Sequence, residues 1–201
     1  MSQPVNARRR GVVATTVGSA VPVLVLAGLM WVVEIIDVPL QGSLDRNGIY
    51  PRSESGLFGV VAAPFLHADF AHLVANTGAF VVMGVLIAVT TRHFWAATVG
   101  IILFGGLGTW LIASPNTIHI GASGVVYGYA AFLVTWGLLA RRLLNIAVAV
   151  VVVVVYGGIA WGVLPGQAGI SWEGHLCGAL AGVGMAWALS RRLDRSRYRA
   201  V

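Results

Sequence analysis

The fold is decided by residues 93–140, which read HFWAATVGIILFGGLGTWLIASPNTIHIGASGVVYGYAAFLVTWGLLA. This run has 48 residues and contains no Asp, Glu, Lys or Arg. A membrane-spanning helix needs about 20 mainly apolar residues, so the run is long enough for two. The segment Ser-Pro-Asn-Thr at 114–117 is typical of a turn and divides it. We therefore expect spans over residues 94–113 and 121–140.

Further apolar runs lie on both sides of this stretch and predict four more spans, over residues 11–33, 70–90, 143–163 and 172–190. The apolar run 55–68 has only 14 residues and contains Pro64, so we expect it to lie in the interface or to re-enter the protein. Asp69 is a candidate N-cap for the span that follows. The chain is thus predicted to be an all-α, polytopic membrane protein with six transmembrane helices.

The composition supports this class. Hydrophobic residues make up 58% of the chain and charged residues 10%, against about 25% charged in soluble domains. The mean hydropathy is +0.85. So few polar residues do not cover the surface of a soluble globular domain, and so many apolar ones exclude a disordered chain. The single Cys177 excludes an intramolecular disulfide.

The basic residues predict the orientation. All 13 are Arg, and with seven acidic residues they give a net charge of +6. We expect no nucleic-acid partner, because the arginines lie at the ends of apolar runs. Six spans place 11 of the 13 on one side, namely Arg8–Arg10, Arg92, Arg141, Arg142 and the five after residue 190. The positive-inside rule then predicts that both termini are cytoplasmic. The expected parts are a short cytoplasmic arm (1–10), a membrane domain (11–190) and a basic cytoplasmic tail (191–201).

Four polar side chains lie inside the predicted spans: His72, Asn76, Ser123 and His175. Such residues are costly in a bilayer and indicate a functional site. Each lies within about two turns of the external end of its span, and the three spans run in the same direction. The side chains therefore share one depth in the outer half of the bilayer and can face one cavity.

Ser123 lies in the sequence Gly121-Ala122-Ser123-Gly124 at the start of a span. The beginning of a helix has free backbone N–H groups and a partial positive charge, which suit a developing oxyanion. The small neighbours allow a peptide backbone to approach. A serine N-cap with glycines for helix packing is the alternative reading.

His175 lies on the last span, close to a ridge of small residues. Glycines at four-residue spacing occur on two predicted helices: Gly124 and Gly128 on one, Gly174, Gly178 and Gly182 on the other. This spacing favours close helix packing, so His175 can reach Ser123. Tyr127, one turn after Ser123, is expected to pack against the imidazole. Glu173 is two residues from His175 and does not share its face, so a Ser–His dyad is expected rather than a triad. A buried structural histidine is the alternative.

His72 and Asn76 are four residues apart and share one face of their helix. Both side chains can donate hydrogen bonds, as an oxyanion hole requires. An i, i+4 pair with a histidine can also bind metal, but only His67 or Asp69 is at hand as a further ligand, so we expect no metal and no cofactor. His67 is expected to brace the loop or line the site. His119 is interpreted as a loop residue.

Over residues 50–190 the sequence resembles the rhomboid family of intramembrane serine proteases. Three motifs occur in the family's order: His67-x4-His72-x3-Asn76, then Gly121-Ala122-Ser123-Gly124 with Tyr127, then His175 with Gly178 and Gly182. Each motif is weak alone, and all three on alternate helices are specific. Two features differ from many relatives, which carry Trp-Arg where this chain has Tyr50-Pro51-Arg52 and often Ala where it has Gly174.

The resemblance implies a six-helix, bacterial-type rhomboid fold and a role for each motif residue. Ser123 would be the nucleophile and His175 the general base and then the acid. The backbone N–H groups of Ser123 and Ala122 would stabilise the oxyanion together with His72 and Asn76. Substrates would be transmembrane proteins, cut in or beside their spans near the external face of a bacterial plasma membrane. The lipid bilayer would be the other partner, and the oligomeric state stays open.

Two other functions compete with proteolysis. A rhomboid-like binder would recognise membrane segments without cutting them, and it would have no need of both Ser123 and His175. A small channel or transporter would need a route through the protein or internal repeats. The polar residues cluster at one depth and no convincing repeat is present, so both are ranked below a protease.

Overall fold

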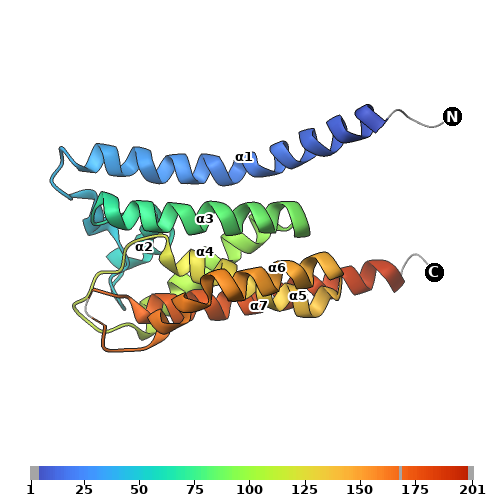
Figure 1. The fold of residues 1–201 in the computed structure, drawn as a ribbon. Helices are drawn as coiled ribbons and strands as arrows, with labels where there is room; N and C mark the ends of the chain where they lie inside the picture. Colours follow the sequence, from blue (N-terminus) through green and yellow to red (C-terminus); the bar gives the residue numbers. More distant parts are fainter. Residues whose placement is uncertain (1–4, 168, 199–201) are drawn as a thin grey trace.

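The computed structural model describes residues 5–167 and 169–198, with side chains from 18 to 167 and from 169 to 191 (Figure 1). The described chain is helical, and within it the extended pairing is one isolated bridge between Ile49 and His119. The all-α prediction is therefore confirmed. The side chains of Arg8–Arg10 and of the arginines after residue 191, which were expected on the cytoplasmic side, lie outside the described set.

The helices lie close to the predicted spans. They are α1 (Val5–Asp37), η1 (Leu44–Asn47), α2 (Ser55–Ala62), η2 (Ala63–Phe65), α3 (Phe70–Thr91), α4 (Phe94–Ile112), α5 (Ser123–Ala140), α6 (Leu143–Tyr156), η3 (Gly157–Val163) and α7 (Trp172–Tyr198). Three differ from expectation. The first helix starts before the apolar run, the span predicted over 143–163 is an α-helix only to Tyr156, and the last helix continues past the predicted end at residue 190 to Tyr198. Gly157 and Gly158, which have low helix propensity, begin the 3-10 turn that replaces it.

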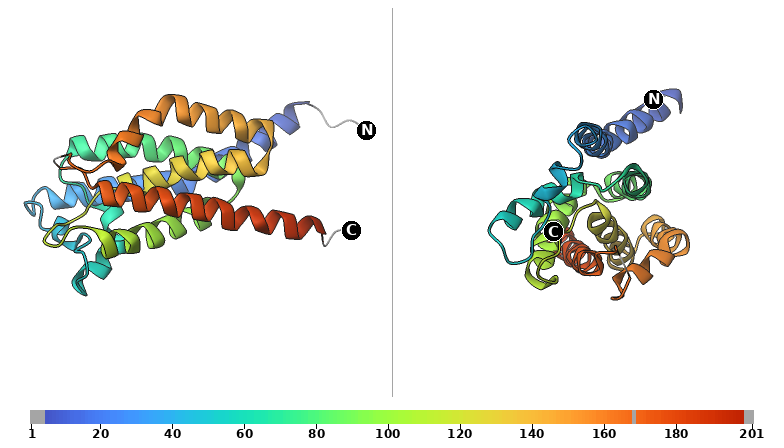
Figure 2. Two further views of the ribbon diagram at one scale, coloured as in Figure 1. Left: turned by 90° about the horizontal axis from the view of Figure 1, so that it is seen from below. Right: turned by 90° about the vertical axis from the view of Figure 1, so that its left-hand side faces the viewer.

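Within the described residues, five segments are long and apolar enough to cross a membrane: Gly18–Asp37, Phe70–Thr91, Phe94–Ile112, Ser123–Ala140 and Leu143–Val163. The chain is thus a polytopic membrane protein. The helix α7 is not among the five, and it carries Glu173 and His175 in its first turns. In Figures 1 and 2 the start of α1 and the end of α7 lie at the same end of the bundle. The sixth span and the cytoplasmic location of the termini stay predictions.

Helix α5 is central to the bundle. It packs against α3, α4, α6 and α7, and Figure 2 shows these helices around it, with α1 outside against α3. Its residues Tyr129, Phe132 and Leu133 are fully or almost fully buried. Large apolar side chains on α1 and α6, such as Val154, are exposed, as lipid-facing residues are.

Glycines bring α5 and α7 into backbone contact. A Cβ atom added at Gly178 would fall on the carbonyl oxygen of Gly124, and one added at Gly182 would fall on that of Gly128. Any larger residue would therefore push the two helices apart. The packing predicted from the glycine spacing brings together the helices that carry Ser123 and His175.

The first loop is held to the end of α4 by Arg52. Its guanidinium donates hydrogen bonds of 2.8 Å to the carbonyl oxygens of Leu111 and Ala113. Its backbone N–H bonds to the carbonyl of Trp110, whose indole N–H donates to Ser53. The end of α4 has carbonyls without helical partners, and Arg52 satisfies those of Trp110 and Leu111 and that of the C-cap residue Ala113. In this loop, which has no Trp-Arg pair, Arg52 thus attaches the loop to the end of α4.

Candidate active site

The central feature is a hydrogen bond between two helices. Ser123 is the first residue of α5, and His175 lies one turn into α7. The Ser123 Oγ lies 2.8 Å from the His175 Nε2, although 52 residues separate them. His175 is 8% exposed and Ser123 is partly buried.

The second ring nitrogen of His175 has a partner that the sequence did not indicate. Its Nδ1 lies 2.9 Å from the carbonyl oxygen of Gly162 in η3. A carbonyl oxygen only accepts, so Nδ1 carries a hydrogen, and in the neutral imidazole Nε2 is then the acceptor for the Ser123 hydroxyl. Every residue has a backbone carbonyl, so the sequence does not show which one will accept this hydrogen bond. The signal available was the glycine-rich stretch 157–162, because a Cβ at Gly162 would collide with the Tyr127 hydroxyl and lie 3.1 Å from Nδ1.

Tyr127 fixes the plane of the imidazole. Its ring is stacked on that of His175, with centroids 4.0 Å apart and planes 8° from parallel. The Tyr127 hydroxyl donates to the carbonyl of Ile159 in η3. The histidine is thus held by a stacked ring on one face and by a carbonyl at its Nδ1 atom.

Asn76 and His72 lie against the backbone that leads into Ser123. Gly121 has a φ of +104°, which disfavours residues with a side chain. A Cβ there would lie 2.7 Å from the His72 Nε2 and 3.5 Å from the Asn76 Nδ2. The Asn76 Nδ2 is buried and has no hydrogen-bond partner among the described residues. An unused buried donor beside a candidate nucleophile is the feature that an oxyanion hole presents before substrate binds.

His67 braces the turn before α5. It is 2% exposed, and its Nε2 accepts a 3.4 Å hydrogen bond from the backbone N–H of Ala122. Burial, together with the nearby His72, lowers the pKa of His67 to about 4, so the ring is neutral and Nε2 can accept. The N–H of Ala122, a predicted oxyanion donor, is therefore engaged with His67 in this structure. His67 fits the bracing role more closely than that of a cavity wall.

His119 lies in the loop before α5, as expected, yet it is 8% exposed and well bonded. Its Nδ1 contacts the Ser171 hydroxyl, and its Nε2 lies 2.9 Å from the Thr117 Oγ1. Burial lowers the pKa of His119, and the charge of Glu173 acts in the opposite direction. His119 thus joins the loop before α5 to the residue before α7, a link that the sequence did not predict.

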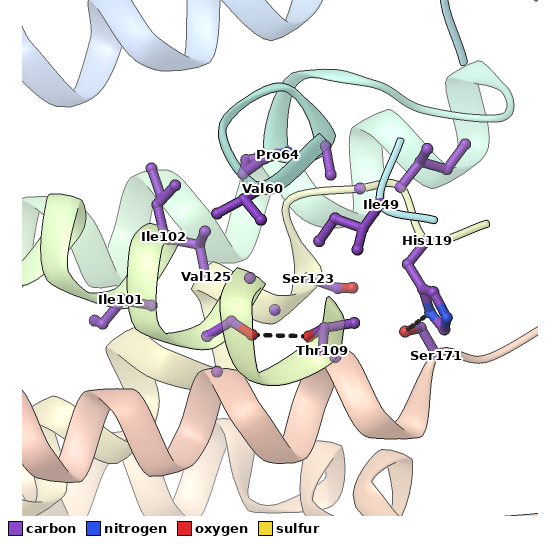
Figure 3. A pocket seen from close by; sticks show the side chains of 18 residues that line it. Ile49, Val60, Pro64, Ile101, Ile102, Thr109, His119, Ser123, Val125 and Ser171 are labelled. Carbon is purple, nitrogen blue, oxygen red and sulfur yellow. Dashed lines mark hydrogen bonds between the residues drawn. The ribbon is translucent and has the colours of Figure 1, made fainter. Parts of the chain in front are cut away.

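Two hollows meet at Ser123. The larger has a volume of about 660 Å³ and reaches His72, Asn76, Ser123 and His175. Its polar lining gives water several partners, and hydrolysis requires water. The smaller, of about 50 Å³, is lined by apolar side chains that include Val60, Pro64, Ile101, Ile102 and Val125 (Figure 3).

The motif residues thus lie in one place, with Gly124, Gly178 and Gly182 at the helix contact beneath them. Over the described part of the chain, no group of three or more His, Cys, Asp or Glu side chains is placed to hold a metal ion. Cys177 is a buried free thiol.

Comparison with known proteins gives a consistent result. The sequence model of the family described as Rhomboid domain matches residues 54–192. An uncharacterized protein of Mycobacterium tuberculosis (strain ATCC 25618 / H37Rv) is 44% identical over 185 residues, which cover 87% of this chain and 77% of that protein. A second, from Mycobacterium leprae, is 43% identical over 88% of this chain and 74% of its own length. Rhomboid-like protein 11, chloroplastic, of Arabidopsis thaliana is 30% identical over 65% of this chain and 52% of its own.

Proposed function

This chain belongs to the rhomboid family, and on that premise we propose that it is an intramembrane serine endopeptidase. Its substrates are other membrane proteins, cut within or beside a transmembrane segment. The observation that carries the proposal is the 2.8 Å contact between the Ser123 hydroxyl and a His175 nitrogen whose tautomer is set by Gly162. A base that is already neutral and correctly oriented is what a serine nucleophile needs.

The first chemical step is attack by Ser123. Its Oγ adds to the scissile carbonyl carbon while its proton passes to the His175 Nε2. The resulting imidazolium keeps its Nδ1–H bond to the Gly162 carbonyl, which becomes stronger because the donor is now charged. The same proton is then given to the leaving amine, which produces an acyl-enzyme at Ser123.

The oxyanion forms on the α5 side of this pair. The Ser123 N–H is the first of the helix and has no acceptor within it. The Asn76 amide and the His72 ring lie against Gly121, two residues away. We assign the oxyanion contacts to these three groups and leave out Ala122, whose N–H is bonded to His67. A single such donor contributes about 10²- to 10³-fold in rate.

Deacylation needs water beside the acyl group. The 660 Å³ hollow extends from Ser123 to the external loops and has several polar side chains in its walls, so it can supply this water. Water enters by this route, loses a proton to His175 and releases the second product. The small apolar pocket is the place for a small side chain next to the cleaved bond.

Six spans with cytoplasmic termini complete the proposal. In that arrangement the loops that hold Ser171, His119 and Asp69 face the outside of a bacterial plasma membrane, and cleavage occurs near the external face. The excess of arginine at the opposite end supports this orientation.

The test is cleavage of a single-span reporter by purified protein in liposomes. The wild type is expected to cut it, and Ser123→Ala is expected to leave background cleavage while retaining its thermal unfolding midpoint. A serine-reactive phosphonate should label the wild type and not the variant. Equal cleavage by both proteins would refute the proposal.

A rhomboid-like binder of membrane segments is the second candidate. The buried Asn76 donor and the bonded Ser–His pair favour catalysis over it. A reporter that co-purifies with the wild type and stays intact after long incubation would reverse this order.

A further inference from the structure

Glu173 is a buried acid in the proposed substrate cavity that takes no part in the proposed chemistry. It is the second residue of α7, and its side chain is 6% exposed. It lines the same 660 Å³ hollow as Ser123 and His175. Among the residues that line this hollow it is the single carboxylate.

The Glu173 carboxylate has no hydrogen-bond donor among the described residues. The titratable group that faces it is His119, whose two ring nitrogens are already engaged by Ser171 and Thr117. Burial also favours the neutral form of that ring. Cys177, one turn further along α7, is the other ionisable neighbour. No described cation therefore compensates the charge of Glu173.

Such a group is costly to bury. An ionised carboxylate away from water needs a cation or several donors. The partial positive charge at the start of α7 lowers this cost in the free protein, and the hollow leaves room for water. A peptide that enters the hollow displaces this water. Binding then becomes unfavourable unless the peptide itself brings a cationic donor.

We propose that Glu173 selects substrates by binding a Lys or Arg side chain close to the scissile bond. The inference rests on the proposed function and names its substrate class, membrane proteins with a basic residue at the external end of a span. Basic residues are depleted on that side of membrane proteins, so this contact would restrict cleavage to a small subset of them.

The experiment is a positional scan with single-span reporters in liposomes. Each reporter carries Arg, Gln or Glu at one of the successive positions on both sides of the scissile bond, and the readout is the ratio of kcat/KM values within each set. At one position the wild type is expected to prefer Arg over Gln by about tenfold or more, since a hydrogen bond to a charged group has roughly this value. Glu173→Gln should bring this ratio close to one, and Glu173→Lys should shift the preference to Glu. Glu54→Gln, which alters an exposed acid at the same end of the molecule, should keep the wild-type ratio.

The possible outcomes separate the two proposals. If the wild type cleaves in a Ser123-dependent manner but prefers Arg at no position, the inference is overturned and the protease stands. This result needs no variant and so does not depend on how the variants fold. A preference that survives in Glu173→Gln likewise overturns it. If no reporter is cut in a Ser123-dependent manner, the proposed function fails, and the selectivity fails with it.

Discussion

The Nδ1 atom of His175 lies 2.9 Å from the carbonyl oxygen of Gly162. In a Ser–His–Asp triad the third member is a carboxylate, which holds the histidine in the correct tautomer. Here a backbone carbonyl occupies that place. The tautomer of the proposed base therefore depends on the conformation of η3, the 3-10 turn that replaces the end of the predicted fifth span.

Gly162→Ala should reduce activity by about 10²-fold, because the added Cβ would collide with the Tyr127 hydroxyl and crowd His175. The measurement is kcat/KM on the liposome reporter. Gly158→Ala is the matched control in the same turn, since its Cβ would meet no atom within 4 Å. Similar activities for the two variants would show that the carbonyl does not position the base.

Asn76→Ala should lower kcat by about 10²- to 10³-fold and change KM little, because the lost donor acts on the oxyanion rather than on bound substrate. Steady-state kinetics with the same reporter would check this. Gly78→Ala, two residues further along α3 and in open space, is expected to keep the wild-type kcat. A rise in KM without a fall in kcat would assign Asn76 to substrate binding instead.

Gly178→Ala should destabilise the protein by about 1–3 kcal/mol, because its Cβ would fall on the Gly124 carbonyl oxygen and separate α5 from α7. Activity should fall with it, since the same contact sets the distance between Ser123 and His175. Thermal unfolding in detergent is the measurement. Gly184→Ala on the same helix has no neighbour within 4 Å and should be neutral or slightly stabilising.

Asp45 predicts a pH dependence of stability. Its burial, reinforced by the charges of Asp37 and Glu34, raises the pKa of its carboxyl from 3.8 to about 6. The folded protein then binds this proton more tightly than the unfolded chain, so the free energy of unfolding falls as the pH rises from about 4 to about 6. Asp45→Asn should remove this part of the pH dependence and stabilise the protein at pH 7. The measurement is the thermal unfolding midpoint as a function of pH across this range. Glu54→Gln, which changes an exposed acid, should keep the wild-type pH dependence. The same pH dependence in Asp45→Asn and the wild type would contradict the prediction.

The helices and the location of the candidate site could be predicted because both depend on the apolar environment of the bilayer and on the spacing of residues along a helix. An uncharged run of 48 residues has few alternatives to crossing a bilayer twice, and Asp69 caps α3 as predicted, its side chain accepting from the His72 N–H at 2.7 Å. Polar residues such as Asn76 stand out in the sequence because so little around them is polar. Glycines at four-residue spacing predicted the close contact between α5 and α7.

The partners of these residues could not be predicted in the same way. The Gly162 carbonyl, the link from His119 to Ser171 and the engagement of the Ala122 N–H by His67 all join segments distant in the chain. They use backbone groups that every residue possesses, or side chains whose direction depends on how loops close. Glu173 illustrates the point, because its sequence position excluded it as a partner of His175 and only its burial beside the cavity indicates another role.

The amino-acid sequence alone thus determined that this protein resides in a lipid bilayer, where its helices lie and at which depth its polar residues meet. These features depend on local hydrophobicity and on the helical period. Tertiary structure decided which nitrogen of His175 faces Ser123, which donors remain free and which carboxylate borders the cavity. The physical reason is that hydrogen bonds depend on distances of a few tenths of an ångström, and such distances arise only when all the helices are packed together.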